Sequence, residues 1–182
     1  MEQKIIELHD LSPAEWKNND LATEVQCAGN QHKCMPTVFI PDLNRRFDLK
    51  FEGRGDSVII GHHLGPRALI WKNTQLYGHH DELGKMTVSL KENKDHAGTI
   101  TPVNIGSSFP AINRNTYFFK MEIENFGTLI SEKPAIVEAL IDSVPPSATY
   151  EFKNGPLNFY MENDPSKRTV MVLEGAQTEV RP

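Results

Sequence analysis

Hydrophobic and polar residues alternate with a period of two through much of the chain from about residue 36 onward. In RFDLKFE (46–52), Phe47, Leu49 and Phe51 fall on one face and charged residues on the other. The same alternation recurs in KMTVSLK (85–91) and TYFFKMEIE (116–124), and further short segments follow between Gly, Pro and Asn turns. This pattern predicts an all-β protein, an antiparallel β-sandwich of immunoglobulin-like or jelly-roll-like type.

One helix is predicted near the N-terminus. Ser12 is a suitable N-cap, Pro13 suits the first helical position and Glu15 completes a capping box, so we expect a short helix near 13–25. The segment PAIVEALIDS (134–143) is ambiguous, because its Ala, Glu and Leu favour a helix while its β-branched residues favour a strand. We predict a strand there, since the turn sequence VPPS follows at once.

Composition is that of an ordinary soluble globular protein, with 38% hydrophobic and 24% charged residues in 182. We find no linker and no repeat of solenoid period, so residues 1–182 are expected to form a single domain. The net charge of −5 without clustered Lys or Arg argues against nucleic acid and anionic membranes as partners. No apolar run approaches the roughly 20 residues of a membrane span, and the first residues do not resemble a secretory leader, so the predicted location is cytoplasmic.

The two cysteines bracket a polar segment, AGNQHK, that could form a hairpin loop. Such a hairpin would bring Cys27 and Cys34 within reach of a disulfide. In the reducing cytoplasm two free thiols are favoured instead. A zinc site from Cys27, His32 and Cys34 is disfavoured, because the spacing lacks the C-x2-C signature.

The sequence lacks the phosphate-binding, zinc-helix and nucleophile-elbow motifs that would identify a reaction. Its main concentration of site-capable residues is a glycine followed by two histidines, which occurs at 61–63 and again at 78–80. If 57–63, 67–72 and 75–80 form a three-stranded meander, both pairs arrive at the same end of the sheet, about 10 Å apart.

That geometry supports two hypotheses for a site. His79 and Asp81, together with His62 or His63, would form a two-histidine, one-carboxylate set for a divalent iron or zinc ion. Alternatively, Arg67 and His80 would bind an anion or a small polar ligand in a pH-dependent way. The simplest alternative to both is that these residues are polar neighbours of turns at the rim of the sheet.

The favoured function is therefore a non-enzymatic binding or protein-interaction module, whose partner is an unknown protein or small molecule. An exposed edge strand would also allow a homo-oligomer. The alternatives are a metal-dependent enzyme that uses the Gly-His-His pairs and, further, a pH-sensitive binder of an anion or small polar ligand.

Overall fold

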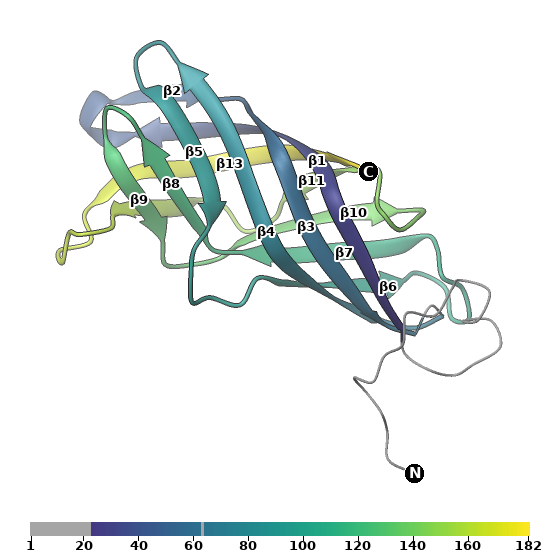
Figure 1. The fold of residues 1–182 in the computed structure, drawn as a ribbon. Helices are drawn as coiled ribbons and strands as arrows, with labels where there is room; N and C mark the ends of the chain where they lie inside the picture. Colours follow the sequence, from purple (N-terminus) through teal and green to yellow (C-terminus); the bar gives the residue numbers. More distant parts are fainter. Residues whose placement is uncertain (1–22, 63) are drawn as a thin grey trace.

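The computed structural model describes residues 23–62 and 64–182, and within them the chain is built from antiparallel β-strands (Figure 1). The predicted all-β class is confirmed. In chain order the elements are β1 (Thr23–Ile40), the short 3-10 helix η1 (Pro41–Leu43), β2 (Arg45–Asp48), β3 (Phe51–Gly61), β4 (Arg67–His80), β5 (Gly84–Leu90), β6 (Ala97–Pro102), β7 (Ala111–Tyr117), β8 (Phe119–Ile123), β9 (Gly127–Ser131), β10 (Ala135–Ile141), β11 (Ala148–Phe152), β12 (Leu157–Met161) and β13 (Thr169–Arg181).

The helix predicted near 13–25 lies outside the described residues over 13–22. At 23–25 the prediction is wrong, because these residues open β1 and pair with β3. Across the described ranges, no helix is long and apolar enough to cross a membrane.

Within the described residues the strands form one 13-stranded sheet, and that sheet closes on itself. β1, β3, β4 and β13 are the long strands, and they form a continuous wall through the pairings β13–β1, β1–β3 and β3–β4. β4 pairs with β5 along 75–80 and with β6 along 67–70, while β13 pairs with β12 along 169–173 and with β11 along 177–180. The finer expectation of an immunoglobulin-like or jelly-roll-like sandwich is not confirmed by this single sheet.

The wall that faces the long strands is consequently divided into two sets. One set contains β5, β8, β9 and β12, and the other contains β6, β7, β10 and β11. We call the level at which the two sets separate the waist of the sheet. On β4 the waist falls between residues 70 and 75, and on β13 between residues 173 and 177.

Two β-bulges bend the long strands at this waist, on either side of Asp56 in β3. In β1, Ala28 and Gly29 together oppose Asp56, and in β4 Lys72 is the extra residue. Gly29 has a φ of +70°, a conformation that favours glycine, and its amide donates to Asp56 Oδ1 at 2.7 Å. The side-chain amide of Asn73 donates to Asp56 Oδ2 at 3.4 Å, so the Asp56 carboxylate is hydrogen-bonded to both bulges.

The hydrophobic faces predicted from the alternation form the core. Phe47, Leu49 and Phe51 are buried, although Phe47 lies in β2, Phe51 in β3 and Leu49 in the break between them. The ambiguous segment at 134–143 is a strand, β10, as predicted.

The core consists of two clusters, one behind each set of facing strands. The first includes Val38, Phe51, Met121 and Phe159, and the second includes Ile59, Trp71, Val137 and Tyr150.

Candidate functional site

Gly61 and His62 lie at one end of the β3–β4 hairpin, and Gly78, His79 and His80 lie at the other. Gly61 pairs with Arg67 beside the connecting turn, whereas Gly78 pairs with Phe51 at the other end. Ten residues of extended strand separate these two levels, or roughly 33 Å. The predicted meander is therefore wrong, because it requires a turn between residues 72 and 75, whereas β4 runs unbroken through them with only a bulge at Lys72.

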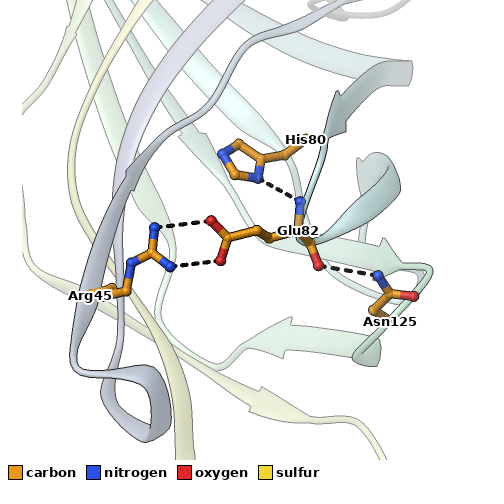
Figure 2. Close-up of polar contacts among 4 residues, drawn as sticks. All are labelled: Arg45, His80, Glu82 and Asn125. Atoms are coloured by element: carbon orange, nitrogen blue, oxygen red, sulfur yellow. Dashed lines mark hydrogen bonds and ion pairs between the residues drawn. The ribbon is translucent and has the colours of Figure 1, made fainter.

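The second pair belongs to the tight connection between β4 and β5 (Figure 2). The Glu82 amide donates to His80 Nδ1 at 3.2 Å, and the Glu82 carboxylate accepts two hydrogen bonds from Arg45 at 2.7 and 3.0 Å. Asn125 donates to the Glu82 carbonyl at 3.1 Å, and the His80 ring meets the Phe47 ring edge-on at 5.2 Å. These contacts fix the turn and tie it to β2 and to Asn125.

The predicted metal ligands are not brought together. His79 and Asp81 are exposed at the β4–β5 end, while His62 lies at the far end, where its Nδ1 accepts a hydrogen bond from the Leu64 amide at 3.2 Å. His63 lies outside the described residues. In the part of the chain that the structure describes, no group of three His, Cys, Asp or Glu side chains could hold a metal ion.

The predicted anion pair of Arg67 and His80 is also not formed, because the two residues occupy opposite ends of β4. Arg67 is only 4% exposed, and this burial lowers its pKa. Its Nη2 donates to the Ser108 carbonyl at 3.0 Å, and its guanidinium lies 4.9 Å from the centre of the Phe109 ring. Arg67 thus holds the segment before β7 against the start of β4.

Both cysteines are free, as favoured from the sequence. A Cys27–Cys34 disulfide is excluded by geometry, because both residues lie on the single strand β1 and seven extended residues span roughly 20 Å. The polar segment between them contains a bulge instead of a hairpin loop. Burial raises the pKa of both thiols, and Thr178 donates a hydrogen bond to Cys34 Sγ at 3.3 Å.

A cavity of about 80 Å³ lies inside the closed sheet, where the two core clusters meet. Its apolar lining comes from both clusters and includes Phe51, Leu76, Val88, Met121, Val137 and Phe159. Its polar lining consists of His32, Cys34, Thr74, Tyr117, Tyr150 and Thr178. Strands of the continuous wall and strands of both facing sets therefore contribute to one cavity.

His32 is the most unusual group in this lining. It is 6% exposed, and its Nε2 has no hydrogen-bond partner among the described residues. Its ring meets the Trp71 ring edge-on, with 5.4 Å between the ring centres. Burial lowers the pKa of His32 to about 4, so the imidazole is neutral near pH 7.

The side chains of His32, Thr74 and Trp71 pack closely over Gly55. A Cβ atom at Gly55 would lie 2.9 Å from His32 Nε2, 3.0 Å from Thr74 Oγ1 and 3.2 Å from Trp71 Cζ3. Any larger residue at position 55 would therefore collide with this cluster.

The other polar groups of the lining are neutral as well. Tyr150 accepts a hydrogen bond from Asn113 at 2.8 Å, and burial raises the pKa of both Tyr150 and Tyr117. Among the described residues that line the cavity, none is Asp, Glu, Lys or Arg. The cavity thus offers apolar surface and hydrogen-bonding groups, with no charge near neutral pH.

The comparisons with known proteins identify no family. No family model matches the sequence, and no curated protein matches it. Among solved structures, the chain is similar to DynF from the dynemicin biosynthesis pathway of Micromonospora chersina, with a TM-score of 0.73 and 19% sequence identity. The match covers 85% of this chain and 80% of DynF. At this identity the likeness concerns the fold.

Proposed function

We propose that this protein is a non-enzymatic binding module that holds a small, largely apolar molecule inside its closed sheet. The observation that carries the proposal is the cavity at the junction of the two core clusters, lined by uncharged groups. Protein cores are normally packed without voids larger than a water molecule. At about 24 cal/mol per Å³, an empty space of 80 Å³ costs on the order of 2 kcal/mol, which an apolar occupant would recover.

The size of the cavity limits what can enter without rearrangement. Typical ligand pockets measure about 300–1,000 Å³, so a larger molecule requires lining side chains to move. Met121 is a flexible candidate for such movement. Phe119 and Phe152 are half-buried and pack against both clusters at the waist, so their displacement would widen the space between the two facing sets of strands.

The structural neighbour is consistent with an organic ligand, because DynF belongs to a biosynthesis pathway. We favour the cavity over the Gly-His-His pairs as the site, since their described residues lie at opposite ends of the hairpin and engage in turn contacts. The proposal is also compatible with the predicted β-sandwich, because the cavity requires only two walls of strands that face each other.

Benzyl alcohol, a small neutral molecule, provides a direct test by methyl and aromatic NMR. We expect a saturable titration that shifts resonances of Val88, Met121 and Phe159 and leaves surface resonances unchanged. An Ala176→Leu variant should weaken binding, because Ala176 lines the cavity and the larger side chain fills it. Ala148→Leu is the matched control, since Ala148 is also a half-buried alanine on a paired strand but does not line the cavity.

Shifts spread over the surface, or equal binding by the Ala176→Leu variant, would refute the proposal. Organic extraction of the purified protein followed by mass spectrometry would then identify any molecule that is retained from the cell.

A further inference from the structure

Resting on the proposed function, we infer that a ligand enters the cavity at the waist of the sheet, between β4 and the β5–β6 loop (91–96), and that His96 latches this loop shut. The ladder that joins β4 to the facing strands is interrupted there, because β4 pairs with β6 up to Ile70 and with β5 only from Gln75. We call this interruption the β4 gap. Opening the sheet at a gap breaks fewer backbone hydrogen bonds than parting two paired strands, so the gap is a weak point in the wall.

A surface groove lies over the β4 gap. It is lined by β4, by the end of β5 and by the β5–β6 loop, through residues 71–75, 89–94 and 96. Thr74 is buried and lines both this groove and the cavity. The groove and the cavity therefore approach each other at the side chain of Thr74.

A second surface groove, which lies over β1, β3 and β13, shares His32 with the cavity. At this level the wall is continuous, because residues 31–34 of β1 pair with β3 on one side and with β13 on the other. Entry there would part paired strands. The β4 gap is consequently the easier route.

β13 has a matching gap between its pairings with β12 and β11, and the β11–β12 loop (153–156) packs against it. A Cβ atom at Gly155 would lie 3.1 Å from the Glu174 carbonyl, so the loop backbone lies directly on β13. The Asn154 side chain accepts a hydrogen bond from the Ile136 amide at 2.7 Å and donates one to the Pro134 carbonyl at 2.8 Å. This short loop is held on both sides, which makes the β13 gap the less favourable entrance.

The imidazole of His96 holds the β5–β6 loop beside the β4 gap. Its Nδ1 accepts a hydrogen bond from the Phe118 amide at 3.2 Å and its Nε2 donates one to the Lys91 carbonyl at 2.8 Å, so a single neutral tautomer makes both bonds. The His96 carbonyl accepts from the Trp71 amide at 3.0 Å, which ties the end of the loop to β4. Because residues 92–95 are exposed, releasing the His96 ring would free the loop to move away from the groove.

The rates at which benzyl alcohol enters and leaves the cavity test this entrance, and NMR line shapes of methyl groups in the lining measure them. Replacing His96 by Ala should raise both rates together by about tenfold, the factor for one to two neutral hydrogen bonds. The Kd should stay nearly unchanged, since His96 does not line the cavity. Asn154→Ala is the matched control, because it removes two hydrogen bonds from the β11–β12 loop and should leave both rates unchanged.

Blocking the groove should have the opposite effect, and this test does not depend on the folding of the His96→Ala variant. Ser89→Trp should lower both rates severalfold, because Ser89 lines the groove from β5. Thr87→Trp is the control, since Thr87 is two residues away on the same face of β5 but does not line the groove.

Unchanged rates in the His96→Ala protein, or an equal acceleration by Asn154→Ala, would overturn the inference while leaving the binding function intact. Equal rates in the Ser89→Trp and Thr87→Trp proteins would overturn it as well. Failure of benzyl alcohol to bind in the cavity at all would instead refute the proposed function.

Discussion

Acidification should destabilise this protein through His32, and replacing His32 by Phe should remove that part of the pH dependence. The imidazole is 6% exposed and burial lowers its pKa from 6.5 to about 4, because the charged form loses its hydration. In the unfolded chain the same side chain takes up a proton below pH 6.5. The stabilisation from the neutral form is therefore complete above pH 6.5 and is lost as the pH falls from 6.5 toward 4.

The magnitude follows from the two pKa values. At about 1.36 kcal/mol per pH unit, the difference between 6.5 and 4 corresponds to about 3 kcal/mol in the free energy of unfolding. Between pH 7 and pH 4.5 the loss from His32 amounts to about 2.5 kcal/mol, since the native state begins to bind the proton near the lower limit. This is a large fraction of the roughly 5–15 kcal/mol that stabilises a typical domain.

Urea unfolding at half-unit pH intervals from 4.5 to 7.5 measures the effect. The informative quantity is the difference in slope between the two proteins, because they differ only at residue 32. His79→Gln is the control for the loss of a histidine that is exposed instead of buried. Parallel curves for the unmodified protein and the His32→Phe variant, or an NMR titration of His32 with a midpoint near 6.5, would refute the reasoning.

Three further predictions concern other parts of the fold. Tyr150→Phe should lower the free energy of unfolding by about 1–3 kcal/mol, because it removes the buried acceptor of Asn113, and thermal or urea denaturation would detect it. Glu82→Gln should cost about 1 kcal/mol or less in the same assay, because its ion pair with Arg45 is half-exposed; a loss above 2 kcal/mol would contradict this. The thiols of Cys27 and Cys34 should react with a disulfide reagent much more slowly in the native protein than in urea, and rapid native labelling would show that they are accessible.

The strands could be predicted from the sequence because one-sided burial imposes a period of two on each of them. The alternation at 46–52 and 85–91 identified residues that the structure buries, including Phe47 and Met86. The bulges could not be distinguished from turns in the same way. Gly29 and Asn73 are residue types common to both, and only the pairing partner in β3 shows that β1 and β4 continue through them.

The candidate site was harder to predict than the fold, because its residues come from strands distant in sequence. His32 was considered only as a weak zinc ligand beside the cysteines, and the sole local signal of its true environment is that it shares the buried face of β1 with Pro36 and Val38. The Gly-His-His repeat is the more conspicuous pattern in the sequence, but the register of the hairpin places Gly61 and Gly78 at opposite ends. Repetition along a sequence says little about proximity when the intervening strand has the full length of the sheet.

The pairing of β1 with β13 closes the sheet, and it joins residues such as Cys34 and Thr178 that are 144 positions apart. Contacts of such long sequence separation slow folding, because much of the chain must be ordered before they form. During synthesis, β1 cannot find this partner until β13 has left the ribosome, so one edge of β1 stays unprotected in the meantime. A molecule that binds in the cavity would consequently stabilise the folded protein without assisting the early steps of folding, because the cavity is completed only when β1 pairs with β13.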